Sequence, residues 1–398
     1  MARLLFFILA AIIEKCVNAN RYPATSLEKR ATCTPLAQGY EMIDDAPAIN
    51  DAIKKCGNGG TIALPADQIY SIRSPIDFST CRNCDFQLEG QLLFSSDPDY
   101  WDKQKAMISM SGVQGAKLRS LTGKGLIDGN ARIFYQRNSD TYGRGLWKSP
   151  VFNLIRESST NILIDNLTIK NMPFQFFRVD ERSSNIRFTR LSVIAENQAW
   201  YMPWTRSDTI GFQFRNCSSI TMDSINVDFK SVDTQPNAGA CVGIDYGTSN
   251  ININNIQCST FDGVMIMFGT VVDDKPFPAA GDQTAKNIYI SNYTAKSIVN
   301  GGFRNLPDYN YPVVSNLTYD GVTVTNGTSL IDDLCFKLDN GRSPGQCSVA
   351  RSIYKQATFS DIWFKNFKGK VGPASLDCFN PQSTCDFHFD NWVNTTVL

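Results

Sequence analysis

The sequence contains a single histidine, His388, near the C-terminal end of its 398 residues. Ser-His-Asp and Cys-His catalytic arrangements need a histidine beside the nucleophile, and many zinc sites need several. Chemistry in the middle of the chain must therefore use carboxylates, Arg, Lys, Tyr or the backbone. We also expect no metal and no cofactor, because carboxylates alone hold a hard cation only weakly.

Net charge and long apolar runs are absent as well. The chain carries 38 Lys and Arg against 38 Asp and Glu, and it has no basic block. Nucleic acid is therefore not an expected partner. No stretch approaches the 18 apolar residues that indicate a membrane span. We expect a monomer.

The N-terminus resembles a targeting segment. Arg3 precedes an apolar run of 10 residues at 4–13, and small residues follow at 17–19. This pattern predicts a signal peptide over residues 1–19 and a secreted, extracellular protein. The dibasic pair at 29–30 suggests a propeptide over residues 20–30, although a solvated charge pair is the simpler alternative.

Glycosylation motifs and cysteines agree with secretion. N-x-S/T motifs occur at Asn166, Asn216, Asn292, Asn316, Asn326 and Asn394. Of the 12 Cys, Cys16 falls in the signal peptide, and an oxidising environment favours disulfides among the rest. Proximity suggests the pairs Cys33–Cys56, Cys241–Cys258, Cys335–Cys347 and Cys378–Cys385. The odd thiol would then be one of Cys81, Cys84 and Cys217.

A short phrase repeats seven times between residues 160 and 370. A small polar residue, usually Asn, precedes apolar residues at alternate positions, as in T-N-I-L-I at 160–164 and S-N-I-R-F at 184–188. Alternation of period two indicates strands with one buried face. The six regular copies lie 24 to 37 residues apart, too close for a strand, a helix and a second strand, and they show no helical period between them.

One unit repeated in this way must stack on its neighbours to bury its apolar face. The sequence therefore predicts an all-β fold, a right-handed parallel β-helix of about ten rungs. The apolar spacing of Ala48, Ile49, Ala52 and Ile53 predicts a short helix that caps its N-terminal end. No composition break divides residues 31–398, so we expect a single domain.

Several frame motifs resemble those of glycoside hydrolase family 28, the polygalacturonases and their exo-acting and rhamnogalacturonan-cleaving relatives. They include D-D-A-P-A-I at 44–49, C-G-N-G-G-T at 56–61 and G-K-G-L-I-D-G-N at 123–130. The similarity covers nearly the whole mature chain and is closest to fungal exo-type members. It implies a pectin-lyase-like solenoid and hydrolysis of acidic cell-wall polysaccharide.

The four active-site motifs of that family are altered in this chain. The N-T-D-G-F-D segment falls on D-T-I-G-F-Q at 208–213, with Ile210 in place of the catalytic Asp and Gln213 in place of the last Asp. The D-D-C motif is interrupted, and Asp233 could replace one member of the pair. In the G-H-G motif the histidine is replaced by Asp262. In the R-I-K motif Arg304 matches, while Leu306 replaces the lysine.

These changes argue against ordinary polygalacturonase chemistry, because an inverting glycosidase needs one carboxyl as acid and another as base. A displaced pair remains available if Asp208, Asp233 and Asp262 line one groove. We expect Asp262 to transfer the proton, with neighbouring carboxylates raising its pKa, and Asp233 to act as base. For each Asp taken singly, a role in a turn is the alternative.

We expect Arg304 to bind an anionic group of the substrate and Gln213 to contact the substrate as well. Two more contacts are expected from Trp204, which ends an aromatic segment at 199–204, and from Arg206, which follows it. The rings could equally anchor a loop. Two other functions stay open. The fold could serve an isomerase or cyclase of fungal secondary metabolism, or a non-catalytic carbohydrate-binding protein.

Overall fold

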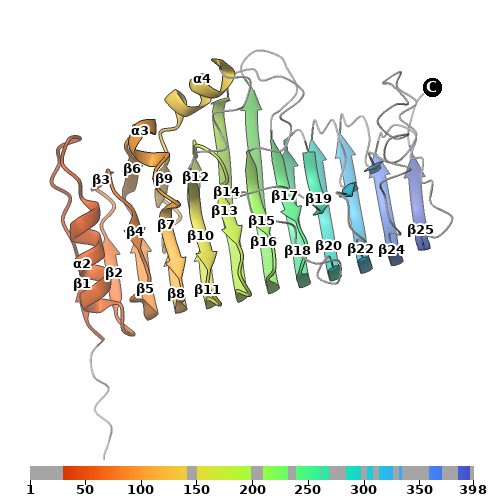
Figure 1. Cartoon of the computed structure of the whole chain (residues 1–398), viewed down its shortest axis with the longest axis horizontal. Helices are drawn as coiled ribbons and strands as arrows, with labels where there is room; N and C mark the ends of the chain where they lie inside the picture. The colour runs from red at the N-terminus through yellow and green to blue at the C-terminus, as the bar shows by residue number, and fades with distance from the viewer. Residues whose placement is uncertain are drawn as a thin grey trace, which may run out of the picture. The chain divides into compact units, whose positions relative to one another are not determined.

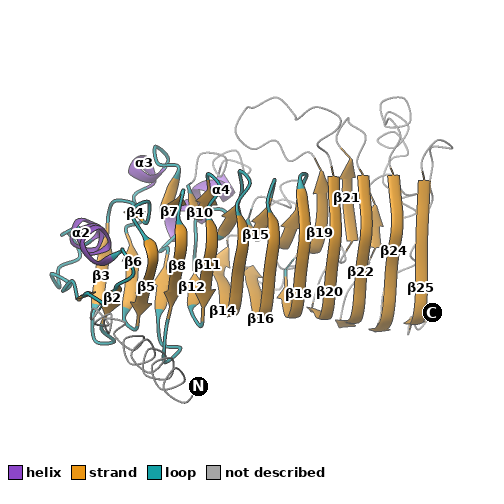
Figure 2. Cartoon of the chain, turned by 90° about the horizontal axis from the view of Figure 1, so that it is seen from below, coloured by secondary structure: helices purple, strands orange, loops and turns teal. Residues whose placement is uncertain are grey.

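The computed structural model describes residues 30–140, 150–198, 209–231, 239–260, 262–268, 284–296, 303–307, 313–325, 331–333, 358–369 and 384–394. Residues Thr32–Leu398 group into one compact unit, apart from Met1–Ala31. Within the described part of that unit, short strands pair in parallel along two long ladders (Figures 1 and 2). This is the right-handed parallel β-helix that the repeat predicts.

The longer ladder forms the main path of a 16-stranded sheet. Its strands, in order, are β1 (Thr32–Cys33), β2 (Thr61–Leu64), β5 (Arg82–Leu88), β8 (Gln114–Arg119), β11 (Thr160–Asp165), β14 (Ser184–Gln198), β16 (Ser218–Ser231), β18 (Thr248–Ser259), β20 (Thr284–Lys296), β22 (Val313–Thr325), β24 (Thr358–Gly369) and β25 (Thr384–Asn394). Four shorter strands join it off the path: β3 (Ile69–Ile72), β6 (Gln91–Phe94), β9 (Leu126–Asp128) and β12 (Thr168–Lys170).

The second ladder is a 9-stranded sheet, and it carries the altered motifs. Its strands are β4 (Ile76–Asp77), β7 (Ala106–Ser111), β10 (Val151–Arg156), β13 (Phe177–Val179), β15 (Ile210–Phe214), β17 (Ala240–Ile244), β19 (Asp262–Phe268), β21 (Phe303–Pro307) and β23 (Ile331–Asp333). Three helices are described: α2 (Ala46–Cys56), α3 (Pro98–Trp101) and α4 (Arg132–Asp140).

The six regular copies of the repeat lie on the longer ladder, and their first apolar residues stack in register, with Ile362 of β24 continuing the column beyond them. This column consists of Ile162, Ile186, Ile220, Ile251, Ile288, Leu317 and Ile362. Each of these residues is 1% exposed or less. The register is fixed because a slip of one residue would turn the whole apolar set outward.

The residue that opens each regular repeat, usually Asn, occupies a left-handed turn. Asn250, Asn287 and Asn316 have φ of 58°, 57° and 52°, a region that Asn tolerates better than most residues. The amide nitrogen of Asn287 donates to Asn250 Oδ1 at 3.0 Å, and that of Asn316 donates to Asn287 Oδ1 at 3.0 Å. The turns are therefore linked along the solenoid.

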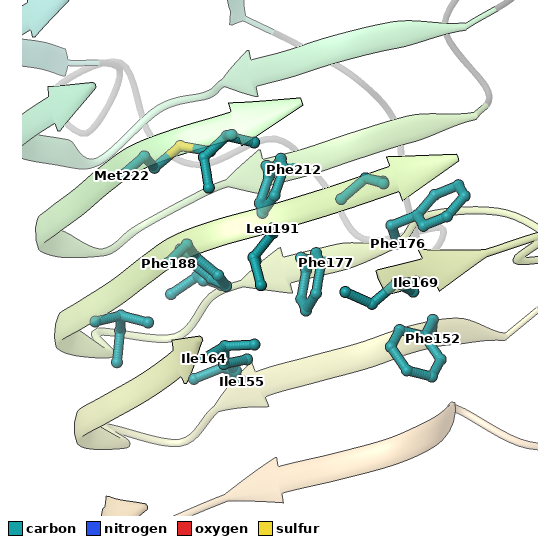
Figure 3. Close-up of a cluster of buried hydrophobic side chains, with 14 of the residues drawn as sticks. Phe152, Ile155, Ile164, Ile169, Phe176, Phe177, Phe188, Leu191, Phe212 and Met222 are labelled. Carbon is teal, nitrogen blue, oxygen red and sulfur yellow. The ribbon is translucent and has the colours of Figure 1, made fainter. Parts of the chain in front are cut away.

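The space between the ladders is filled by large apolar side chains (Figure 3). Phe177 and Phe212 pair in register and stack with ring centroids 5.0 Å apart and planes 10° apart. Phe188 from the longer ladder packs edge-on against Phe212 at 5.1 Å. The two sheets are thus joined through one continuous core.

Helix α2 covers the first strands, as the sequence predicts. Pro47 lies in its first turn, which suits a residue that lacks an N–H, and Lys54 and Lys55 lie in its last turn. Its buried face includes Ile49 and Ile53, and it contacts β1, β2, β3 and β4. Such a cover protects the otherwise open end of the ladder.

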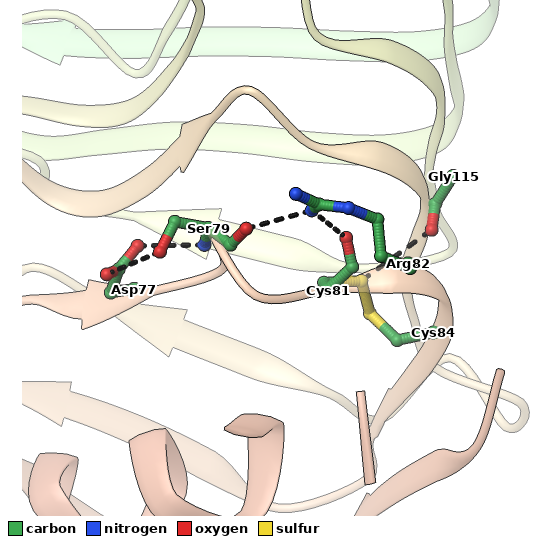
Figure 4. Close-up of a disulfide and its surroundings, with 6 residues drawn as sticks. All are labelled: Asp77, Ser79, Cys81, Arg82, Cys84 and Gly115. Carbon is green, nitrogen blue, oxygen red and sulfur yellow. Dashed lines mark hydrogen bonds between the residues drawn. A yellow bond between two sulfur atoms is a disulfide. The ribbon is translucent and has the colours of Figure 1, made fainter. Parts of the chain in front are cut away.

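Three disulfides are present among the described residues. Two are expected pairs, Cys33–Cys56 and Cys241–Cys258. The third joins Cys81 to Cys84 (Figure 4). Cys217 is a buried free thiol. The expected pairs Cys335–Cys347 and Cys378–Cys385 are not tested, because the structure does not describe the side chains of these four residues.

The turn around Cys81–Cys84 is held by Arg82. Its Nη1 donates to the carbonyl oxygens of Ser79 and Cys81 at 2.8 and 2.7 Å, and Ser79 N donates to Asp77 Oδ1 at 2.8 Å (Figure 4). Both sulfur-bearing residues are 1% exposed or less, so this disulfide is structural rather than accessible to a redox partner.

Candidate active site

Three motif positions stand in one row at the start of neighbouring strands. Ile210 pairs with Ala240 in register, and Ala240 pairs with Asp262. The three residues are 2%, 0% and 0% exposed. Ile210 and Ala240 form a small apolar cluster with Met265, separate from the main core. We call Ile210, Ala240 and Asp262 the site row.

Backbone hydrogen bonds tie the site row together. Asp262 N donates to Gly239 O at 2.9 Å, and Ala240 N donates to Thr209 O at 2.8 Å. Thr260 Oγ1 donates to Asp262 O at 2.6 Å. Gly239 has φ +66°, and a Cβ there would lie 2.4 Å from Thr209 O. Only glycine fits this approach of the two strands.

The site row contains one carboxyl where a glycosidase needs two. The motif resemblance predicts a catalytic Asp at the position that Ile210 occupies. The structure adds that Ala240 stands between Ile210 and Asp262, a position that the interrupted D-D-C motif does not predict. The signal was present, since Ala240 directly precedes the C-V-G-I segment that continues the family pattern.

A second row follows along the same strands. Arg178 pairs with Gln213, Gln213 with Gly243, and Gly243 with Met265. Gln213 is 0% exposed, and its Oε1 accepts a hydrogen bond from Gln175 Nε2 at 2.6 Å. This hydrogen bond holds the expected substrate contact Gln213 in a fixed orientation.

An ion cluster lies at the end of these strands. Arg178 Nε and Nη2 donate to Asp180 Oδ2 at 3.2 and 2.8 Å, and Arg215 Nε donates to the same oxygen at 3.0 Å, while its Nη2 also bonds to it. Glu181 N donates to Asp180 Oδ1 at 2.8 Å. Burial raises the pKa of Asp180, and the positive charge of Arg178 opposes that rise.

Cys217 is not a candidate nucleophile. Burial raises the pKa of its thiol well above the ordinary value, and the negative charges of Asp180 and Asp245 raise it further. The nucleophile in cysteine chemistry is the thiolate, which this environment disfavours.

The remaining expected site residues are not placed by the structure. Asp208, Asp233, Trp204 and Arg206 lie outside the described residues. Arg304 lies in β21, where it pairs with Asp332 of β23, but its side chain is not described. In the chain, Asp208 directly precedes Thr209, and Asp233 precedes Gly239 by six residues. The carbonyl oxygens of Thr209 and Gly239 accept the hydrogen bonds from the site row.

Across the described part of the chain, no group of three or more His, Cys, Asp or Glu side chains is arranged to hold a metal ion. None of the described helices is long and apolar enough to span a membrane.

Comparison with known proteins identifies the family. The profile of Glycosyl hydrolases family 28 matches residues 58–395. This chain belongs to that family. It is 34% identical over 376 residues to the probable endo-xylogalacturonan hydrolase A of Aspergillus flavus, covering 92% of this chain and 85% of that protein.

Further matches agree with this assignment, one in sequence and two in fold. The endo-xylogalacturonan hydrolase A of Aspergillus tubingensis is 32% identical over 382 residues, covering 92% of this chain and 86% of that protein. The crystal structure of endo-xylogalacturonan hydrolase from the same organism superposes with TM-score 0.73 at 28% identity, covering 91% of this chain and 92% of that one. A polygalacturonase from Erwinia carotovora ssp. carotovora has TM-score 0.58 at 13% identity, covering 92% and 97%, and this second match supports the fold alone.

Proposed function

We propose that this family 28 protein is secreted and hydrolyses glycosidic bonds in the galacturonate backbone of pectin-type polysaccharides. The observation that carries the proposal is the similarity to endo-xylogalacturonan hydrolases over more than nine tenths of the chain. Xylogalacturonan is therefore the first substrate to test. The exo-polygalacturonase and rhamnogalacturonan types, to which the frame motifs are similar, are the next two.

The proposed chemistry uses a displaced carboxylate pair. Asp262 is the proton-transferring group in the site row, and Asp233 is the partner base. Asp233 precedes Gly239 by six residues in the chain, and the carbonyl oxygen of Gly239 accepts a hydrogen bond from Asp262 N. Arg304 serves as the anion clamp for a uronate, because a guanidinium binds a carboxylate with two parallel hydrogen bonds. The distance between the two carboxyl groups would indicate whether hydrolysis retains or inverts the configuration at the anomeric carbon.

A second candidate is a carbohydrate-binding protein without turnover. Ile210 and Ala240 favour it, because neither side chain can donate or accept a proton at the site row. Loss of general acid or base help typically lowers a rate by about 100- to 10,000-fold for each group. The isomerase or cyclase alternative gains nothing from the relatives, which are hydrolases by name.

One experiment separates these functions. The purified protein is incubated with xylogalacturonan, polygalacturonate and rhamnogalacturonan, and new reducing ends and product lengths are measured. Release from one of them supports hydrolysis, and the product lengths distinguish endo from exo cleavage. Binding to a uronan without any release would refute the proposed hydrolase and support the second candidate.

A further inference from the structure

A surface hollow lies near the N-terminal end of the solenoid, away from the site row. Its volume is about 140 Å³, and a cavity of about 150 Å³ holds one benzene ring. The buried ring of Phe94 forms part of its wall. Its polar lining includes Glu41, Arg73, Ser96, Asp97 and Asn130. The hollow therefore has about the size of one sugar ring.

Most of the lining comes from the same row of turns as the site row. Residues 71–73 precede β4, residues 93–97 precede β7, and Asn130 precedes β10, all strands of the second ladder. The site row lies at the first residues of β15, β17 and β19 in that ladder. Helices α3 and α4 lie in these turns, along the upper edge of the solenoid in Figure 1. A long ligand that follows this edge reaches both places.

The walls of the hollow are fixed by hydrogen bonds within the fold. Ser95 N donates to Ile72 O at 2.8 Å, which joins two successive turns. Ser71 Oγ donates to Glu41 O at 2.6 Å, which holds the N-terminal segment against the first of them. A site that is organised in advance loses little conformational entropy when a ligand binds.

Several side chains of the lining have hydrogen-bonding capacity that the fold does not use. Within the described part of the chain, the carboxylate of Glu41, the hydroxyl of Ser96 and the side-chain amide of Asn130 have no partner. The guanidinium of Arg73 makes one long contact there, from Nη1 to Glu41 O at 3.4 Å. Asp97 uses Oδ1 to accept a backbone N–H of α3 at 3.2 Å. The hollow thus offers both donors and acceptors, which sugar hydroxyl groups need.

The charge of the lining favours a neutral ligand. Glu41 and Asp97 carry two negative charges against the one positive charge of Arg73. Asp44 and Asp45 add negative charge next to the wall, since their carboxylates accept hydrogen bonds from the backbone of the first turn at 2.8 Å each. A carboxylate in the hollow would meet mostly like charge, which opposes binding.

We propose that this hollow binds a neutral sugar unit of a polysaccharide. The inference rests on the proposed function for one point, that the sugar belongs to a pectin-type chain. The turn before β7 is five strand steps from Asp262 on β19, or about 24 Å at the usual strand spacing. A chain that occupies both places spans several sugar units. The hollow therefore acts on substrate binding and not on the chemical step.

The test measures binding of methyl β-xyloside, a neutral sugar, and of galacturonate, a charged one, by ligand-observed NMR titration. Ser96→Leu places an apolar side chain in the hollow, and Glu41→Gln removes one charged acceptor. Glu157→Gln is the matched control, because Glu157 lies in the turn after β10 at the other edge of the ladder and makes only surface ion pairing with Arg156. Thermal unfolding of each variant shows that it is folded.

We expect the parent to bind the xyloside with a Kd in the millimolar range, as a ligand of about ten non-hydrogen atoms allows. Ser96→Leu should weaken this binding by at least about tenfold, because the new side chain fills the hollow. Glu41→Gln should weaken it by about fivefold, the difference between a charged and a neutral acceptor. Glu157→Gln should bind the xyloside as the parent does, and Ser96→Leu should leave any binding of galacturonate unchanged.

Three results would overturn the proposal. The first is a parent that binds no xyloside, and the second is an unchanged xyloside affinity in Ser96→Leu and Glu41→Gln. The third is an equal loss of galacturonate binding in Ser96→Leu, which would contradict the preference for a neutral sugar. If Ser96→Leu does not fold, Glu41→Gln decides, since the exposed carboxylate of Glu41 has no partner among the described residues.

Failure of this site differs from failure of the proposed function. A parent that binds the xyloside in the hollow but releases no reducing ends from any pectin-type chain supports the site and refutes the hydrolase. A parent that hydrolyses xylogalacturonan, while Ser96→Leu keeps both its xyloside affinity and its KM, refutes the site alone.

Discussion

Replacing Asp262 by Asn tests the proposed chemistry most directly. The side chain is 0% exposed and stands in register with Ala240. Asn keeps the size and the hydrogen-bonding capacity of Asp but cannot exchange a proton. If Asp262 is the proton-transferring group, kcat should fall by about 100- to 10,000-fold, which corresponds to about 3–5 kcal/mol of activation free energy.

The assay is reducing-end release on the substrate that the parent cleaves fastest, measured across pH. The pH profile should lose the limb that Asp262 produces, which a purely structural change would not do. Asp223→Asn is the control, because Asp223 lies on β16 in the longer ladder and accepts hydrogen bonds from Asn254 and Asn255 there. If Asp262→Asn stays within about twofold of an active parent, Asp262 is only a turn residue and the reasoning is wrong.

Three further outcomes are expected. Asn153 is 0% exposed between Ile108 and Phe177, and neither of its amide atoms hydrogen-bonds to a described protein group. Asn153→Leu should therefore stabilise the protein by about 1–3 kcal/mol in denaturant unfolding, and a loss of stability would show that the amide is satisfied. Burial acts to raise the pKa of Asp85, but hydrogen bonds from Arg119 and Gln87 outweigh it and lower that pKa. The pair thus stabilises the fold above the ordinary Asp pKa of about 4, and this contribution is lost as pH falls through the lowered value. Arg119→Gln should cost below about 1 kcal/mol at neutral pH, and the difference from the parent should vanish in acid. Treatment with a chelator should leave any hydrolysis unchanged, and a loss of activity would contradict the metal-independent site.

The fold could be predicted from the sequence because every coil must bury one apolar face and make the same kind of turn. The inward column from Ile162 to Ile362 and the Asn turns each show a period that is visible without a structure. The site was predicted less completely. Ala240 was not predicted because a small apolar residue carries no catalytic signal of its own, and its place in the row follows only from strand register.

The disulfide between Cys81 and Cys84 and the Asp180 cluster could not be predicted for a related reason. Three cysteines were candidates for one free thiol, and only the folded turn selects Cys217. Arg178 and Asp180 are neighbours in the chain, but Arg215 joins them through the pairing of β13 with β15. Contacts that arise from stacking rather than from local pattern remain invisible in a single sequence.

The linked asparagine turns have a consequence for how this chain acquires its structure. Each strand of the long path pairs with the strand before it and the strand after it, and β14 pairs with β12 as well, so every new coil needs a finished neighbour as its template. Assembly in such a system proceeds as a zipper from a nucleus, with each step stabilised by one interface. Helix α2 covers the end of the chain that is synthesised first, so growth could begin there and follow synthesis toward the C-terminus. If one turn did not form, folding would stop at that coil, and all later coils would remain unfolded.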